Sequence, residues 1–300
     1  MSTALIGIDW GSTHARAFRY DRSGQCIETR RSDAGITRCP AGSIPGILLD
    51  ELTDWLAAAP DVPLLVCGMA GSAVGWQEVP YVQAPVGLSG LVDGLRVFAY
   101  AGRQVGIVPG VAGFCDKAGF TDVMRGEETQ FVGLSDTLPV LIAPGTHSKW
   151  IEGGPDGITA LHTFMTGEMY ALLRQHSLVG RVCADADWDE AAFQEGLSVA
   201  SVHPDWLNQL FGVRARGVLG ERTPAALSSW LSGLLIGYEM VQGLQRLAGK
   251  PAQVGVVASG QLTGPYLAAL ACFGVQGIAI DGEQAVTRGL WQIAKKAGWV

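Results

Sequence analysis

The sequence predicts an α/β fold with two domains, and three observations lead to this prediction. Short apolar strands joined by glycine-containing turns occur at residues 4–30 and again at residues 139–162. After each occurrence, segments with helical spacing alternate with further short strands, which is typical of layered α/β proteins. The chain has 300 residues, 48% of them hydrophobic and 16% charged, which is enough to fill two cores. We therefore expect a duplicated β-meander, with each copy opening its own domain.

The first half contains the clearer meander. Turns at Gly11 and at Asp21–Gly24 separate its three strands. A segment with helical apolar spacing follows, and then a short buried strand. The expected elements are strands at 4–9, 14–20 and 25–30, a helix at 43–58 and a strand at 63–67.

The second half repeats this order and then becomes mainly helical. Its meander strands are expected at 139–143, 148–152 and 158–162. Three helix starts follow: Thr166 as the cap of a helix to about residue 179, Asp187 with Glu190 at capping-box spacing, and Thr223 before Pro224. The last of these opens a long apolar helix that Gly249 ends. The remaining elements are a strand at 253–258, a turn at Ser259–Gly260, a helix at 265–272, a strand at 275–280 and a helix at 282–297.

The change of domain is expected just before the second meander, near residues 134–138. No linker or low-complexity segment marks it. We therefore divide the chain into domains at 1–136 and 137–300.

Charge and composition exclude several classes of protein. The net charge of −7 argues against nucleic-acid binding, which favours a basic surface. We find no apolar run long enough for a membrane span and no leader segment, so we expect a cytoplasmic protein without membrane partners. The histidines and cysteines lack metal-ligand spacing, and the cysteines are expected to be reduced. These cysteines are Cys26, Cys39, Cys67, Cys115, Cys183 and Cys272.

Two small-residue turns are candidates for binding phosphate. In the first, Asp9 precedes Gly11, Ser12 and Thr13, so a carboxylate, backbone N–H groups and two hydroxyls lie together. A carboxylate suits a hydrated divalent cation, but an ordinary hairpin turn has the same residues. The second turn, Gly145–Lys149, falls at the equivalent point of the second meander, where Ala143 replaces the acid. The repetition favours a two-part phosphate clamp over two ordinary hairpins.

Three further segments carry possible chemistry. Residues 121–130 gather four charged side chains near the domain boundary, where a carboxylate is able to act as a general base. The alternative is that Asp122 caps a helix and that Glu127 and Glu128 favour its positive end. Residues 67–76 form a glycine-rich loop that either lies against a ligand, with Trp76 as a wall, or is a plain connection with a core tryptophan. Residues 254–260, a strand ending in Ser-Gly, are a weaker candidate for facing a nucleoside.

Several common catalytic motifs are absent from the sequence. It contains no P-loop motif and no G-x-G-x-x-G dinucleotide motif. It also lacks the G-x-S-x-G nucleophile elbow. The sequence therefore supports neither a P-loop nor a Rossmann dinucleotide site for the two candidate phosphate turns.

The segments resemble one known family when they are read together. They are Asp9–Thr13, Gly68–Ser72 with Gly75–Trp76, Asp122–Gln130, Pro144–Trp150, Thr163–Glu168 and Ser232–Gly237. In this order they strongly resemble the 2-dehydro-3-deoxygalactonokinase family. The resemblance implies the actin-like ATPase superfold, with two ribonuclease-H-like domains and an interdomain active-site cleft for ATP and sugar.

The resemblance also implies a reaction and a set of site residues. The reaction is ATP-dependent phosphorylation of the 6-hydroxyl of 2-dehydro-3-deoxy-D-galactonate, a step of galactose breakdown. The implied sites are Asp9 for Mg²⁺, Gly11, Ser12, Thr13, Gly145 and Thr146 for the ATP phosphates, Ser259 and Gly260 for adenosine, and Gly71, Ser72, Trp76 and Arg125 for the sugar acid. The oligomeric state is left open between a monomer and a homodimer.

Two points stay open at the level of sequence. Glu127, which follows Gly126, fits the position of the general base in related sugar kinases, and Asp122 is its rival. Ala73 stands where family members often carry an arginine, so Arg103 or Arg125 has to supply the cation for the substrate carboxylate. The alternative functions are a kinase of the same fold for another sugar or sugar acid, and a non-catalytic, nucleotide-regulated actin-like binding protein.

Overall fold

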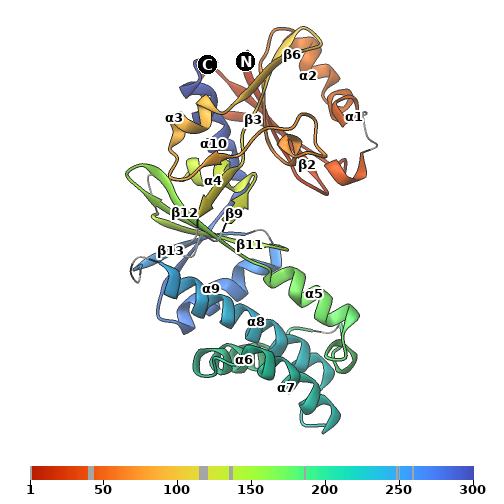
Figure 1. Cartoon of the computed structure of the whole chain (residues 1–300). Coiled ribbons are helices and arrows are strands. Elements are labelled where there is room, and N and C mark those ends of the chain that lie inside the picture. The colour runs from red at the N-terminus through yellow and green to blue at the C-terminus, as the bar shows by residue number, and fades with distance from the viewer. Residues whose placement is uncertain are drawn as a thin grey trace. The chain divides into compact units, whose positions relative to one another are not determined.

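The computed structural model describes residues 2–39, 44–114, 121–134, 138–185, 187–247, 249, 251–258 and 260–300. It is a mixed α/β structure with sheets of six, five and three strands (Figure 1). The chain divides into two compact units. Unit 1 comprises Met1–Pro139, Ile151–Leu161 and Gly282–Val300, and unit 2 comprises Val140–Trp150 and His162–Asp281. This division differs from the expected domains 1–136 and 137–300, because two later segments belong with the first unit.

The six-stranded sheet of unit 1 contains the predicted first meander. Its strand order is β3-β2-β1-β4-β7-β6. The first three strands pair antiparallel, whereas β4 pairs parallel with β1 and with β7. The strands are β1 (Thr3–Trp10), β2 (Ala15–Asp21), β3 (Cys26–Ser32), β4 (Leu64–Gly68), β6 (Arg96–Tyr100) and β7 (Arg103–Ile107). Strands β1 and β4 therefore end side by side, with Asp9 opposite Cys67 and Trp10 opposite Gly68.

The remaining elements of unit 1 are a small sheet and five helices. The sheet has the order β5-β8-β9 and comprises β5 (Val82–Gln83), β8 (Val111–Phe114) and β9 (Thr121–Met124). The helices are α1 (Ile44–Glu51), α2 (Thr53–Ala58), α3 (Leu88–Asp93), α4 (Glu127–Val132) and α10 (Gly282–Lys296). The single helix predicted at 43–58 is therefore two helices, since the second begins after Leu52.

The five-stranded sheet has the order β12-β11-β10-β13-β14. This is the order of the first five strands of the larger sheet, so the duplicated meander is confirmed. Its strands are β10 (Val140–Ala143), β11 (Ser148–Gly154), β12 (Gly157–Phe164), β13 (Gln253–Val257) and β14 (Gln276–Ile280).

The helices of unit 2 surround a separate apolar core. They are α5 (Thr166–His176), α6 (Glu190–Val202), α7 (Trp206–Val218), α8 (Pro224–Arg246) and α9 (Thr263–Cys272). Helix α8 is the longest of these and packs along α6 (Figure 1). Buried residues of the two helices, among them Phe193, Leu197, Leu231 and Leu234, pack in this interior.

Helix starts in unit 2 confirm one prediction and correct two. Thr223 caps α8, accepting a hydrogen bond from Ala226 N at 3.2 Å, and Pro224 is the first helical residue. Thr166 is not a cap: it is the first residue of α5, and its hydroxyl donates to Glu239 instead. Asp189, rather than Asp187, caps α6 and accepts from Ala192 N at 3.0 Å. Side-chain competition for more distant partners explains why local spacing failed at Thr166.

Candidate functional site

The carboxylate of Asp9 lies at the end of β1 and forms an ion pair with Arg16 of β2. The two residues are directly opposite in the antiparallel pairing of the strands. The other oxygen of Asp9 faces the Cys67 thiol at 3.8 Å. Arg16 was missed by the sequence reasoning, although the register of a hairpin predicts which residue faces Asp9.

The turn after β1 is held in place by a neighbouring segment. The Gly11 N–H donates to His14 O at 2.9 Å, so this group closes the hairpin. Thr37 donates to Ser12 O through both its backbone and its hydroxyl. The side chains of Ser12 and Thr13 are exposed. The turn thus presents two hydroxyls on a fixed backbone, next to Asp9.

Two glycines with positive φ bring the start of α4 to the end of β4. Gly68 has φ +82° and Gly126 has φ +113°, values that side chains rarely adopt. A Cβ on Gly68 would lie 2.7 Å from Trp10 O and 3.4 Å from Asp9 Oδ1, and a Cβ on Gly126 would lie 3.4 Å from Gly68 Cα. Asp9, Gly68 and Gly126 are therefore consecutive neighbours in space. The carboxyl ends of parallel strands commonly form binding sites in α/β proteins.

The two rival carboxylates lie on different elements. Glu127 is the first residue of α4, directly after Gly126, and its Oε2 accepts from Arg125 N at 3.1 Å. Asp122 lies in β9 opposite Gly113, and its Oδ1 accepts from Val123 N at 2.7 Å. The alternative that Asp122 caps a helix is wrong, because the residue is within a strand. Only Glu127 directly follows the glycine that contacts Gly68.

Glu128 is fully buried next to Glu127. Its Oε2 accepts from Gly126 N at 2.7 Å and its Oε1 accepts from the Thr129 hydroxyl at 3.0 Å. Burial, and then the charge of Glu127, raise the pKa of Glu128 to about 8. Burial, and then the charges of Asp9 and Glu128, likewise raise the pKa of the Cys67 thiol. Two buried titratable groups with raised pKa values therefore accompany Asp9 and Glu127 in unit 1.

Arg125 lies against the glycine-rich loop that follows β4. A Cβ on Gly71 would lie 2.6 Å from Arg125 Nη1, so a side chain there would displace the guanidinium. Arg125 Nη2 donates to Val79 O at 2.8 Å, and the group lies 4.3 Å from the centre of the Tyr81 ring. Its Nε and Nη1 are buried and have no hydrogen-bond partner within the described residues. Arg103 instead donates to the backbone oxygens of Leu56 and Ala101.

Two of the residues predicted to bind substrate have local structural roles. The Ser72 hydroxyl donates to Met69 O at 2.8 Å and closes the turn of the loop. Trp76 packs edge-on against Trp10, Phe98 and Tyr100, with ring centres 5.2–6.4 Å apart. The contacts support the alternative interpretation of Trp76 as a core tryptophan.

The second small-residue turn lies in unit 2 and is tied to the start of α5. Glu168 N donates to Thr146 O at 2.9 Å, and His147 Nε2 lies 2.6 Å from Glu168 Oε2. A Cβ on Gly167 would lie 2.3 Å from Gly145 O, so the helix start lies directly on the turn. Thr146 itself is exposed. Contacts with the start of α5 therefore hold the turn in place, while Thr146 is exposed to solvent.

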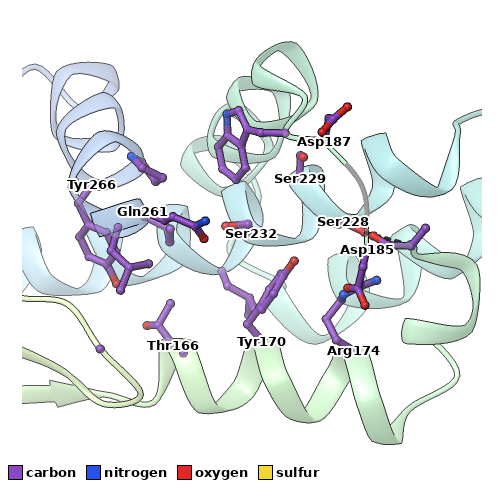
Figure 2. A pocket seen from close by; sticks show the side chains of 18 residues that line it. Thr166, Tyr170, Arg174, Asp185, Asp187, Ser228, Ser229, Ser232, Gln261 and Tyr266 are labelled. Atoms are coloured by element: carbon purple, nitrogen blue, oxygen red, sulfur yellow. Dashed lines mark hydrogen bonds and ion pairs between the residues drawn. The ribbon is translucent and has the colours of Figure 1, made fainter. Parts of the chain in front are cut away.

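A cavity of 660 Å³ lies beside this turn, wholly within unit 2. Thr166, Tyr170 and Arg174 line one side of it from successive turns of α5, and Ser228, Ser229 and Ser232 of α8 lie opposite (Figure 2). Its lining also includes Gly145, Gly167, Ala184, Asp185, Asp187, Trp188, Leu235, Ile236, Gln261, Leu262, Pro265 and Tyr266. The cavity thus combines aromatic and aliphatic side chains with hydroxyl, carboxylate, amide and guanidinium groups.

This cavity is lined in part by residues of segments that the sequence analysis singled out, namely Thr166 and Gly167 of Thr163–Glu168, and Ser232, Leu235 and Ile236 of Ser232–Gly237. Gly145 of the second phosphate turn also lines the cavity. Gln261, which directly follows the expected adenosine turn at Ser259–Gly260, lines it as well. Gly260 has φ +64° and is exposed, whereas Ser259 lies outside the described residues. The serines of α8 hold the opposite wall: Ser228 donates to Ala184 O at 2.6 Å and Ser229 accepts from Asp189 N at 3.0 Å. Their spacing within an apolar helix was the available signal.

The described part of the chain contains neither a cluster of metal ligands nor a membrane-spanning helix. No three His, Cys, Asp or Glu side chains of these residues converge as a metal-binding group. None of the helices within these ranges combines the length and hydropathy that a membrane span requires.

Comparison with known proteins agrees with this arrangement. The family model for 2-keto-3-deoxy-galactonokinase matches residues 9–293. The 2-dehydro-3-deoxygalactonokinase of Escherichia coli (strain K12) is 37% identical over 296 residues, which are 98% of this chain and 98% of that protein. A crystal structure from Sinorhizobium meliloti, provisionally described as a 2-dehydro-3-deoxygalactonokinase, has a TM-score of 0.89 at 32% identity and covers 97% of this chain and 98% of its own.

A more distant structure shows the fold alone. Component A of (R)-2-hydroxyglutaryl-CoA dehydratase from Acidaminococcus fermentans has a TM-score of 0.52 at 10% identity and covers 98% of both chains. The fold class expected from the sequence, the actin-like ATPase fold of sugar kinases, is confirmed by these neighbours. The match of the family model over nearly the whole sequence, with a relative of the same name at 37% identity, shows that the chain belongs to the 2-keto-3-deoxy-galactonokinase family.

Proposed function

We propose that this chain transfers the γ-phosphoryl group of ATP to the 6-hydroxyl of 2-dehydro-3-deoxy-D-galactonate. The observation that carries the proposal is the meeting of Asp9, Gly68 and Gly126 in a chain 37% identical to the Escherichia coli enzyme of that name. The new bond forms between the 6-oxygen and the γ-phosphorus, and the bond from that phosphorus to ADP breaks. Phosphoryl transfer depends mainly on positioning and on neutralising charge.

Glu127 is assigned the role of general base. It takes the proton of the 6-hydroxyl, which requires an ionised carboxylate within hydrogen-bond reach. Burial raises the pKa of its neighbour Glu128 to about 8, so the two adjacent carboxyl groups lie in different surroundings. Such divergence between neighbouring carboxyl groups is common where one of them does acid–base work. Asp122 remains the rival until the two are compared by substitution.

The nucleotide is assigned to the 660 Å³ cavity and to the turn beside it. Gly145 and Thr146 are placed at the phosphates, and Gly260 with Gln261 at the nucleoside. The supporting observations are the exposed Thr146 of the turn and the aromatic side chains in the cavity lining, to which Tyr170 and Trp188 contribute. Aromatic side chains with interspersed hydrogen-bonding groups suit a nucleoside.

The residues around Asp9 fit a magnesium ion that arrives with ATP. Mg²⁺ in phosphate-transferring enzymes keeps several waters and uses one or two carboxylates. Among the described residues, the Cys67 thiol lies 3.8 Å from Asp9 Oδ1 as a donor, which leaves this oxygen capacity to accept a hydrogen bond from a metal-bound water. When bound, the ion would neutralise charge on the phosphates, while Ser12 and Thr13 contribute hydroxyl donors. Arg16 holds the other Asp9 oxygen and fixes the orientation of the carboxylate.

The carboxylate of the sugar acid is assigned to Arg125. Its Nε and Nη1 have no partner within the described residues, and a buried donor without a partner is costly. A substrate carboxylate would supply an acceptor for one of these nitrogens, and charge-assisted hydrogen bonds between arginine and carboxylate are strong. The assignment supplies the cation that Ala73 does not provide, and it leaves Gly71 as the residue that makes room.

A substrate panel tests the proposed function. ADP release is measured with 2-keto-3-deoxy sugar acids, other sugar acids and neutral hexoses, and the phosphorylated position is identified by NMR. We expect the highest kcat/KM with 2-dehydro-3-deoxy-D-galactonate and phosphate on its 6-oxygen. A higher kcat/KM for glucose or another sugar would identify a kinase of the same fold with a different substrate. The absence of transfer to every acceptor would favour the non-catalytic binding protein.

The base assignment is tested with a matched pair of substitutions. Glu127→Gln keeps the acceptor for Arg125 N but cannot take a proton, so kcat should fall by about 10²–10⁴-fold. Asp122→Asn should leave kcat within a few-fold of the wild type. The reverse pattern would transfer the role to Asp122, and two unaffected variants would remove both residues from it.

A further inference from the structure

A carboxylate that the proposed reaction does not use is buried in the middle of unit 2. Glu239 lies on α8 and is 2% exposed. Burial raises the pKa of its carboxyl group. An ionised group is costly to bury unless hydrogen bonds replace its hydration. The position therefore calls for an explanation beyond packing.

Four donors satisfy this carboxylate, and none comes from its own helix. Oε1 accepts from Ser148 Oγ at 2.6 Å and from Trp150 Nε1 at 2.9 Å, both on β11. Oε2 accepts from the Thr166 hydroxyl of α5 and from the Tyr266 hydroxyl of α9, the latter at 2.6 Å. One side chain thus connects α8 to a strand and to two further helices. No described residue offers it a cationic partner among these contacts.

The connected segments are the ones that form the proposed nucleotide site. Ser148 directly follows the turn that contains Gly145 and Thr146. Thr166 begins α5, whose next two residues contact that turn through the close approach of Gly167 to Gly145 and the hydrogen bond from Glu168 N to Thr146 O. Thr166 and Tyr266 also line the cavity, and Figure 2 shows them near one another at the same end of it.

We propose that Glu239 is a positioning residue that fixes the phosphate turn relative to the nucleoside side of the ATP site. The inference rests on the proposed function, because it requires that the cavity takes ATP. A carboxylate suits this role since each of its oxygens accepts two hydrogen bonds, so four donors are held at one point. Hydrogen bonds to a charged acceptor are stronger than neutral ones, which limits the movement of all four segments.

The test removes single donors and leaves Glu239 in place. Thr166→Val and Tyr266→Phe each delete one hydroxyl with little change of shape. Tyr238→Phe is the matched control: Tyr238 is on α8, 6% exposed, and its hydroxyl donates to His203 O at 2.7 Å. The dissociation constant for ATP is measured by calorimetry on the full chain, together with KM for ATP and for the sugar acid.

We expect both site variants to raise the Kd and the KM for ATP by about five- to tenfold, which corresponds to about one lost hydrogen bond. The KM for the sugar acid should stay unchanged, and Tyr238→Phe should change neither constant. Wild-type affinity for ATP in Thr166→Val and Tyr266→Phe would overturn the inference, as would an equal loss in Tyr238→Phe. A wild-type chain that does not bind ATP would refute the nucleotide assignment itself, and this outcome is distinct from the others.

Discussion

Glu127 and Glu128 show how two neighbouring residues of the same type acquire different chemistry. Glu127 is half-buried at the first position of α4, whereas Glu128 is fully buried behind it. The sequence presents them as equivalent, because both favour the positive end of a helix dipole. Only the packing of α4 decides that Glu128 loses contact with water. The pKa of Glu128, about 8, is the consequence.

This difference predicts how stability depends on pH. The ordinary pKa of the group is 4.5 and the folded value is about 8, so between these pH values the folded state holds a proton that the unfolded state releases. The contribution of this group to the free energy of unfolding therefore decreases as pH rises through that window. Glu128→Gln does not titrate. Its stability relative to the wild type should increase between pH 5 and pH 8, by up to about 1.4 kcal/mol per pH unit.

Denaturant titrations of both proteins at several pH values measure this difference. Glu221→Gln, an exposed carboxylate just after α7, is the control and should follow the wild type at each pH. A constant difference between Glu128→Gln and the wild type would show that Glu128 is ionised in the folded protein.

The assignment of Arg125 leads to a second prediction at the scale of the residue. Arg125→Lys keeps the charge but loses the planar fork, so it should raise KM for the sugar acid by about 10- to 100-fold. Arg103→Lys is the matched control, because Arg103 donates to two backbone oxygens instead. Steady-state kinetics at saturating ATP measure both. A larger effect in Arg103→Lys would move the carboxylate site to that residue.

At the scale of the element, glycines decide how closely α6 and α8 approach. A Cβ on Gly233 would lie 2.1 Å from Phe193 O, and a Cβ on Gly196 would lie 2.4 Å from Trp230 O. The two helices therefore touch backbone to backbone. Glycine has a low helix propensity, so glycines inside a segment argue against a helix when propensity is considered alone. Here they are present because the partner helix packs so closely that a side chain would not fit.

This packing predicts opposite effects for two identical substitutions. Gly233→Ala should lower the free energy of unfolding by about 1–3 kcal/mol, because the methyl group would overlap Phe193 O. Gly212→Ala on α7, where the nearest atom would be 3.7 Å away, should raise it by about 0.5–1 kcal/mol through helix propensity. Thermal and denaturant unfolding measure both variants. Stabilisation by both would mean that α6 and α8 are able to move apart.

At the scale of the whole molecule, the end of the chain completes the first unit. Helix α10 packs against α4 and β1, and the Tyr20 hydroxyl donates to Thr287 O at 2.9 Å. Its buried residues include Val286, Leu290 and Ile293. Each apolar side chain of this size contributes about 1.5–3 kcal/mol when buried. Unit 1 therefore depends on residues that are almost 300 positions apart.

Removal of residues 282–300 should unfold unit 1 and leave unit 2 folded. Limited proteolysis with mass spectrometry should then find cleavage throughout residues 2–134, whereas fragments from 162–281 persist. A chain that lacks only Val300, which is 39% exposed, should resist proteolysis as the full chain does. Protection of unit 1 without α10 would show that its sheet is stable alone.

The sequence by itself determined the duplicated meander, the order of most elements and the family. Strand alternation, turn glycines and local caps such as Thr223 depend on neighbours within a few residues, so these signals are readable. The single helix predicted at 43–58 and the caps predicted at Thr166 and Asp187 were wrong: the first is two helices, Asp189 caps α6, and Thr166 donates to the distant Glu239 instead.

The tertiary structure decided the contacts between segments far apart in the chain. It pairs Asp9 with Arg16, places Gly68 against Gly126, gathers four donors on Glu239 and returns α10 to the first unit. It also packs Trp76 edge-on against Phe98 and Tyr100. These features depend on packing and burial, which act through space and leave no periodic pattern along the chain.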